Sequence, residues 1–96
     1  MNKYEIMFIV RPEIDEKARE NSVKTLEKAL KSNKATITLN KDMGQKELAY
    51  EIKKCKSGYY YLYNIEAKDD KAVNEFSRLA RIDENILRHL IVKEGE

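Results

Sequence analysis

The segment Gly44-Gln45-Lys46-Glu47-Leu48-Ala49-Tyr50-Glu51-Ile52 lies near the middle of the chain and has the alternating pattern of a β-strand. Its apolar side chains occupy even positions, whereas the preceding residues 35–40 place theirs on odd positions. Successive side chains of a strand point to opposite faces, so one extra residue is needed to keep both apolar sets on the inward face. Glycine tolerates the backbone of such an insertion. We therefore predict a β-bulge at Met43-Gly44, with Leu39 and Leu48 both facing inward.

Outward from this strand, the hydrophobic periodicity predicts five further elements. Apolar residues three and four positions apart indicate helices, and alternation indicates strands. In chain order we first expect a strand at 3–10 ended by Pro12, and then a helix capped by Asp15 and closed at 32–34. The strand described above follows, and a turn at 56–58 leads to a returning strand at 59–66. A helix capped by Asp69 or Asp70 and a last strand at 86–92 complete the chain.

Two strand–helix–strand units in succession are typical of the ferredoxin-like fold, an α+β arrangement with a split β-α-β motif. Right-handed crossovers then place both helices on one face of a four-stranded antiparallel sheet. A chain of 96 residues is long enough for one hydrophobic core. We expect a single domain over residues 1–96, with the second face of its sheet left open.

The composition limits the possible partners of this domain. Lys and Arg number 19 and Asp and Glu 17, which gives a net charge of only +2. Phosphate binding scales with the number of phosphates neutralised, so any contacts with RNA should be few, or shared with a second protein. Cys55 is the only cysteine and excludes an intrachain disulfide, which favours a reducing compartment. No signal peptide or membrane span is apparent, so we expect a cytoplasmic protein.

The residues that catalysis or metal binding would require are missing from the sequence. His89 is the only histidine, and no cluster of Cys, His and Asp has the spacing of metal ligands. The three glycines form no phosphate-binding loop, and the serines lack a triad context. We expect neither an enzyme nor a cofactor, metal ion or small-molecule substrate.

Three ordered blocks give the chain a likeness to a known family. They are residues 44–52, the opening stretch Tyr4-Glu5-Ile6-Met7-Phe8-Ile9-Val10-Arg11-Pro12, and the stretch 81–93. The central block resembles the pattern Gly-x-Arg-x-Leu-Ala-Tyr-Pro-Ile of the bacterial small-subunit ribosomal protein six family. Two positions depart from that pattern: Glu51 replaces the proline, and Glu47 stands where members often have a basic residue.

The resemblance implies a structural constituent of the bacterial small ribosomal subunit, located in the ribosome in the cytoplasm. It implies binding to the central domain of small-subunit ribosomal RNA, together with ribosomal protein eighteen. By the same resemblance, basic residues within the matching blocks are expected to contact the RNA. These are Lys3, Lys46, Arg81 and Arg88, and Arg78 lies one helical turn before Arg81 and extends the group.

The open face of the predicted sheet carries apolar side chains from several strands. Small sheets can carry scattered surface apolars, but contributions from several strands at once favour a surface covered by a partner, either RNA or a protein. Leu87, His89 and Ile91 are expected on the inward side of the last strand. The outward residues, expected to be at least partly exposed in the free protein, are Met7, Ile9, Tyr60, Leu62, Leu90 and Val92.

Three alternatives remain open at this point. The tyrosines of residues 59–63 invite comparison with the aromatic strand of RNA-recognition domains, whose rings stack on bases, but tyrosine also favours strands for packing, which is the favoured role for most of these rings. Arg88 would have a purely structural role if it formed an ion pair with Glu5. The chain as a whole could instead be a ferredoxin-like regulatory domain that associates with itself through its sheet and binds a small ligand.

Overall fold

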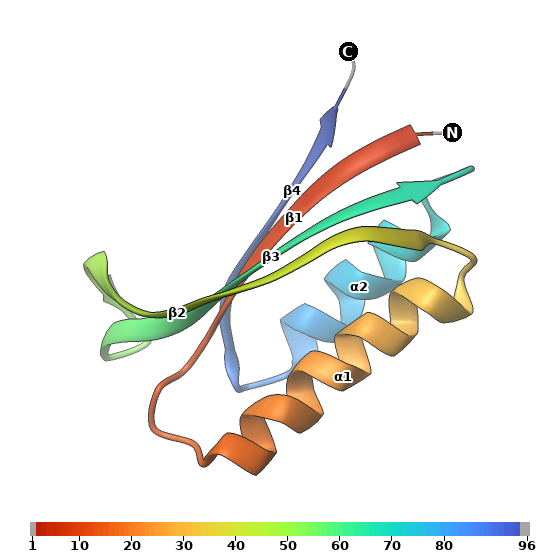
Figure 1. Cartoon of the computed structure of the whole chain (residues 1–96). Helices are drawn as coiled ribbons and strands as arrows, with labels where there is room; N and C mark the ends of the chain where they lie inside the picture. The colour runs from red at the N-terminus through yellow and green to blue at the C-terminus, as the bar shows by residue number, and fades with distance from the viewer. Residues whose placement is uncertain (1, 95–96) are drawn as a thin grey trace.

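The computed structural model describes residues 2–94, so Met1 and residues 95–96 of the predicted domain lie outside the described part. The elements are β1 (Asn2–Val10), α1 (Glu16–Ser32), β2 (Thr36–Ile52), β3 (Cys55–Ala67), α2 (Lys71–Ile82) and β4 (Ile86–Glu94). The four strands form one antiparallel sheet in the order β2-β3-β1-β4. Both helices lie side by side against one face of this sheet (Figure 1). The predicted ferredoxin-like α+β fold is confirmed.

The helix starts follow from short polar side chains at the predicted places. The Asp15 carboxylate accepts a hydrogen bond from the Ala18 backbone N–H at 2.7 Å, which confirms it as the cap of α1. At the start of α2 the N-cap residue is Asp70, but its side chain makes no capping hydrogen bond to the helix. Asp69 accepts from the Lys71 N–H at 3.0 Å, whereas Asp70 accepts from the Tyr4 hydroxyl at 2.5 Å and so ties the helix to β1.

The main core lies between the sheet and the two helices, and we call it the helix-side core. Phe8 occupies its centre and is only 1% exposed. Its ring is stacked on Tyr61 at 5.2 Å between centroids and meets the edge of Phe76 at 5.6 Å. Such aromatic pairs add to the free energy of burial, so β1, β3 and α2 are joined at one point. The core also includes Tyr4, Ile6, Val10, Leu26, Leu30, Tyr63, Ile65, Val73 and Ile86.

The predicted bulge in β2 is present. Asp42 pairs with Tyr61 and Gly44 pairs with Tyr60, so Met43 between them is the extra residue. Gly44 has a φ of 78°, a conformation that glycine adopts without steric cost, and its N–H donates to the Asp42 carboxylate at 2.9 Å.

A second bulge in β2 was not predicted. Ile37 pairs with Ile65 and Leu39 pairs with Asn64, which leaves Thr38 as another extra residue. This insertion moves Leu39 to the open face, where it is 40% exposed. The expectation that Leu39 faces the helices is therefore wrong.

Two insertions also reverse the expected direction of the segment that follows Gly44. Leu48 and Ile52 pack against Ile9 on the open face, not in the helix-side core, and Tyr50 is 59% exposed. The prediction of an inward face formed by these even positions is wrong, because a one-residue shift exchanges the two faces of a strand and two such shifts, at Thr38 and Met43, precede this segment.

The hairpin turn lies earlier in the chain than predicted. Lys53 and Lys54 connect β2 to β3 with φ values of 47° and 67°, the two left-handed positions of a two-residue hairpin turn. Residues 56–58 belong to β3 instead. Gly58 has another role there, since a Cβ at this position would overlap the Cγ2 atom of Ile9. It permits close approach of β1 and β3.

One residue of β4 also changes face. Ile9 pairs with Arg88 and Val10 pairs with Ile86, so Leu87 is an extra residue between them. Leu87 packs with Ile9 on the open face and is 5% exposed. Its predicted inward position is wrong, although His89 and Ile91 lie opposite Phe8 and Ile6 as expected.

Candidate functional site

The face of the sheet without helices has a small hydrophobic cluster of its own, which we call the open-face cluster. Ile9, Cys55 and Leu87 are buried in it, and Leu48, Ile52 and Tyr60 pack around them as partly buried residues. Burial raises the pKa of the Cys55 thiol, as does its hydrogen bond to the Glu13 carboxylate at 3.5 Å. The thiol is therefore a packed, protonated group, unsuited to nucleophilic chemistry.

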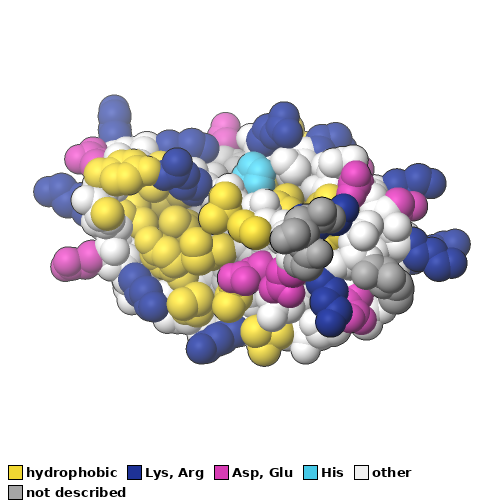
Figure 2. Space-filling view, turned by 90° about the horizontal axis from the view of Figure 1, so that it is seen from above, with side chains coloured by type: hydrophobic (Ala, Val, Ile, Leu, Met, Phe, Trp, Pro, Cys, Tyr) yellow, Lys and Arg dark blue, Asp and Glu magenta, His cyan; other side chains and the backbone are white. Residues whose placement is uncertain are grey.

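The remaining apolar side chains of this face form a surface around the cluster. Figure 2 looks down on the face and shows hydrophobic side chains gathered on one half of it, with Lys and Arg around the margin. Met7, Tyr60 and Leu62 are half-buried, whereas Leu90 and Val92 are 54% and 48% exposed. Together with Tyr50 and Ile52, several of these residues line a hollow of about 390 Å³.

Ile9 is the exception among the six residues predicted for a partner-protein surface. It is 6% exposed, because Leu87 and Cys55 cover it from β4 and β3. The expectation that it is partly exposed in the free protein is wrong. Ile9 lines the floor of the hollow and is covered on most sides by its neighbours.

Arg88 lies at the edge of the hollow and contacts the hairpin. Its guanidinium donates a hydrogen bond to the Tyr50 hydroxyl and lies 5.7 Å from the centre of that ring. Glu5 is opposite Val92, farther along the sheet, and its alternative ion pair with Arg88 is not formed. Arg88 and Tyr50 are both exposed, so the pair forms a cationic and aromatic rim beside the apolar surface.

The two lysines predicted to contact RNA lie far apart on the sheet. Lys46 is exposed and pairs with Gly58, so it lies at the hairpin end of the open face. Lys3 is at the opposite end of β1, about 20 Å from Ile9 at the usual rise per residue of a strand. Its ammonium group lies 4.0 Å from the Glu66 carboxylate, which offsets part of its charge.

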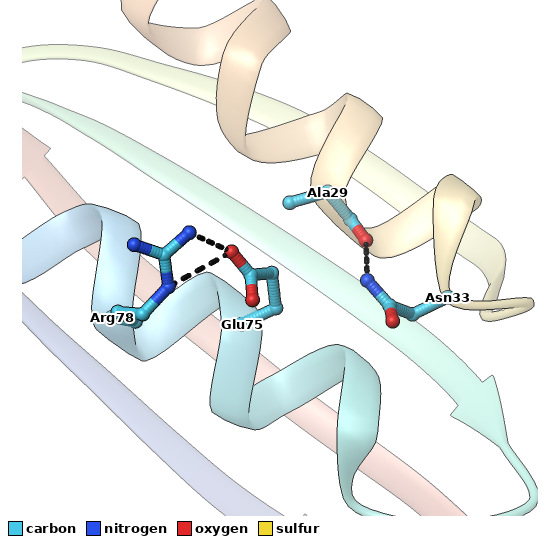
Figure 3. Close-up of polar contacts among 4 residues, drawn as sticks. All are labelled: Ala29, Asn33, Glu75 and Arg78. Carbon is cyan, nitrogen blue, oxygen red and sulfur yellow. Dashed lines mark hydrogen bonds and ion pairs between the residues drawn. The ribbon is translucent and has the colours of Figure 1, made fainter.

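Arg78 and Arg81 project from α2 and therefore do not lie on the open face. Figure 3 shows the Arg78 guanidinium directed toward the Glu75 carboxylate, and this hydrogen-bonded pair lowers the pKa of Glu75. Arg81 donates to the Ser77 hydroxyl at 3.2 Å, and that hydroxyl lies 3.1 Å from His89 Nε2. Burial lowers the pKa of His89, and the charge of Arg81 lowers it further.

The structure thus divides the five predicted basic residues among three places. Arg88 and Lys46 flank the apolar half of the open face, Arg78 and Arg81 lie on α2, and Lys3 is at the far end of the sheet. They do not form one continuous patch. Arg88 and Lys46 are the pair that one surface could use together with the apolar hollow.

The tyrosines of β3 lie mainly on the packed side. Tyr61 is stacked in the helix-side core, the Tyr63 hydroxyl donates to Glu27 at 3.1 Å, and the Tyr59 ring lies 3.8 Å below the Arg19 guanidinium. Only Tyr60 faces the open side next to the hollow. The packing interpretation of this segment is confirmed for these three rings.

Sequence reasoning missed four contributors to the open face: Leu48, Tyr50, Ile52 and Leu87. The first three were assigned to the opposite face because the bulge at Thr38 gives no signal in the sequence. Within residues 2–94, no group of His, Cys, Asp and Glu is arranged to hold a metal ion. In the same range, neither helix has the length and apolar character needed to cross a bilayer.

Comparisons with a family model and with solved structures agree with each other. The family model described as ribosomal protein S6 matches residues 3–93. A crystal structure of the 30S ribosomal protein S6 from Thermotoga maritima superposes with a TM-score of 0.91 and 30% sequence identity. The alignment covers 97% of this chain and 87% of that one, so the likeness extends over the whole fold.

Proposed function

The chain belongs to the ribosomal protein S6 family, a family of the small ribosomal subunit, and we propose that it binds the central domain of small-subunit ribosomal RNA jointly with ribosomal protein eighteen. In this proposal the partner protein covers the apolar half of the open face, and a few cationic side chains, at the margin of that face and on α2, contact phosphates. The protein acts as a rigid structural component and has no catalytic part.

The observation that carries the proposal is the uncovered hydrophobic surface around the open-face cluster. Leu90 and Val92 are about half exposed, and a hollow lined by Met7 and Tyr60 lies beside them. Large exposed apolar patches with a charged rim are typical of protein interaction sites. Phosphate backbones offer nothing to such a surface, so a protein partner fits it better than RNA does.

The charges support shared RNA binding. The net charge is +2, and two of the five predicted basic residues, Lys3 and Arg78, already lie against carboxylates. Arg88, Lys46 and Arg81 remain as the phosphate contacts that we propose. Since each phosphate contact contributes about one unit to the salt dependence of binding, an isolated chain with about three contacts should bind RNA weakly at physiological salt.

The test measures binding of a central-domain RNA fragment by the purified chain, with and without the partner protein, over a range of salt concentrations. We expect weak binding alone and much tighter binding with the partner. Arg88→Ala should lower the salt slope by about one unit. Tight RNA binding by the chain alone would contradict the proposal.

A matched pair of variants tests the apolar surface. Leu90→Asp places an unpaired charge beside the hollow and should abolish the gain from the partner protein, because a desolvated charge without a counter-charge is costly. Leu39→Asp makes the same chemical change on the same face at the β2 edge, outside the hollow, and should leave that gain intact. Both sites are exposed, so neither change should alter stability by more than about 0.5 kcal/mol.

A further inference from the structure

The two edges of the sheet differ in how well they could accept another strand. Figure 1 shows β2 and β4 as its outer strands. Bulges at Thr38 and Met43 interrupt β2, and interruptions of this kind protect an edge against pairing. β4 has its only irregularity at Leu87 and then pairs without a break with β1 from Arg88 to Glu94. Residues 88–94 therefore form a regular outer edge, and no other strand within residues 2–94 pairs with it.

We propose that β4 is a self-association edge, where β4 of a second copy of this chain pairs antiparallel about a two-fold axis at Ile91. This register places Arg88 opposite Glu94 of the second copy and Leu90 opposite Val92 of the second copy. A two-fold axis repeats every pair, so each dimer has two Arg–Glu pairs and two Leu–Val pairs on the open face. The helix-side pairs, Ile91 with itself and His89 with Lys93, add no opposite charges.

The pairing of opposite charges favours the axis at Ile91 over an axis one residue earlier. An axis at Leu90 would place Arg88 opposite Val92 and leave Glu94 opposite Ile86, so that both charges would face apolar side chains. Directly opposed side chains of unlike charge stabilise antiparallel strands, whereas like charges destabilise them. The axis at Ile91 satisfies both charges and covers Leu90 and Val92, the two most exposed apolar residues of β4.

The dimer would join two four-stranded sheets into one continuous sheet with both open faces on the same side. The inference does not rest on the proposed function, but the two are linked, because a partner that covers Leu90 and Val92 would compete with the second copy. Self-association is then a state of the free protein that ends when the partner binds. Pairing of one short edge buries little area, so we expect a weak dimer with a dissociation constant on the order of 10⁻⁴ M.

Sedimentation equilibrium of the full chain over a wide concentration range tests the proposal. Arg88→Glu and Glu94→Arg should each weaken the dimer about tenfold, because each replaces two attractive pairs by two repulsive ones. The double variant R88E/E94R restores opposite charges at both positions and should return the dissociation constant to within about threefold of the original. Tyr50→Phe removes only the hydrogen bond that Arg88 forms within the chain and should have no effect.

A cross-linking experiment tests the register independently of stability. Chains with Leu90→Cys are mixed with chains with Val92→Cys under mild oxidation, and the axis at Ile91 predicts disulfides between the two kinds of chain in preference to either kind alone. Cys55 is 3% exposed and out of reach. A chain that stays monomeric up to about 1 mM, a dimer indifferent to both charge reversals, or cross-linking without that preference would overturn the proposal.

Discussion

The two faces of the sheet share the same strands but differ in how they are completed. The helix-side core has two helices over it and includes large side chains such as Phe8, Tyr63 and Phe76, each about 1% exposed. The open-face cluster has three buried residues and no covering element within residues 2–94. The chain itself covers one face, and in the proposed function another molecule covers the other. Stability and recognition are therefore separated by the alternation of side chains along each strand.

The contrast is sharpest in β1, where neighbouring residues serve the two faces. Phe8 points into the helix-side core and Ile9 into the open-face cluster, and both are buried. Burial alone does not distinguish them. Phe8 and Ile9 differ instead in the number of structural elements packed around them, and this difference should appear in the free energy of unfolding of variants at the two positions.

The largest expected effect comes from truncating this pair. Phe8→Ala should cost about 3–5 kcal/mol of unfolding free energy, because a stacked ring between β3 and α2 leaves a cavity that cannot close. Ile9→Ala should cost about 2 kcal/mol, at the low end for such a change, because the surrounding residues lie at the surface and can move inward. Urea denaturation at neutral pH gives both values.

The order of the two costs is the decisive result. An Ile9 variant as destabilised as the Phe8 variant would mean that the open-face cluster is as rigidly enclosed as the helix-side core. The variants should also differ in partner binding. Phe8→Ala should retain it below its unfolding midpoint, whereas Ile9→Ala, which removes support for the hollow, should weaken it.

Gly58 gives a second, smaller test at the contact between β1 and β3. Gly58→Ala should destabilise the protein by about 1–2 kcal/mol, because the new methyl group overlaps Ile9 Cγ2 and lies 3.2 Å from the Val10 carbonyl oxygen. Its backbone is not in the left-handed region, so the cost is one of packing alone. The measurement is again the shift in denaturation midpoint.

A double variant shows whether Ile9 causes that cost. Combined with Ile9→Ala, which removes the overlapping atom, Gly58→Ala should be nearly neutral, so the two costs should be strongly non-additive. Simple addition of the two effects would place the cost at the Val10 carbonyl instead.

The sequence predicted well those elements whose pattern is local. The faces of β1 follow from strict alternation, and the cap of α1 follows from the position of Asp15 before a helical pattern. The sequence-based prediction failed where the tertiary structure determines the position of a bulge or a turn. The bulge at Thr38 has no glycine to mark it, and the turn at Lys53-Lys54 uses left-handed lysines where the sequence has no Asn-Gly signal.

Those two failures had consequences for the candidate site. Five of the six residues of the predicted partner surface are exposed or half-buried on the open face, because β1, β3 and most of β4 keep a simple alternation. Tyr50 and Leu48 were missed because an unseen insertion reversed their direction. Four of the basic residues were predicted from the resemblance, and Arg78 from its helical spacing before Arg81. Neither signal indicates whether a carboxylate lies within reach, as Glu75 does for Arg78.

The smallest expected effect is at His89, on the outer margin of the helix-covered face. The Ser77 hydroxyl accepts a hydrogen bond from Arg81 and lies 3.1 Å from His89 Nε2, so the ring is held beside a positively charged side chain. Burial and the Arg81 charge both lower the pKa of His89 below its ordinary value near 6.5. The unfolded chain therefore binds a proton more readily than the folded chain does.

Stability should accordingly fall as the pH is lowered from about 6.5 toward 5, and be unaffected by His89 above that range. His89→Gln cannot take up the proton and should lose less stability over the same interval, as measured by urea midpoints at pH 7.5 and 5.5. Arg81→Ala should raise the pKa of His89 in an NMR titration, because it removes the neighbouring positive charge. Identical pH dependence in the parent protein and His89→Gln would show that His89 is equally solvated in the folded and unfolded states. The helix-covered side would then not extend to its ring.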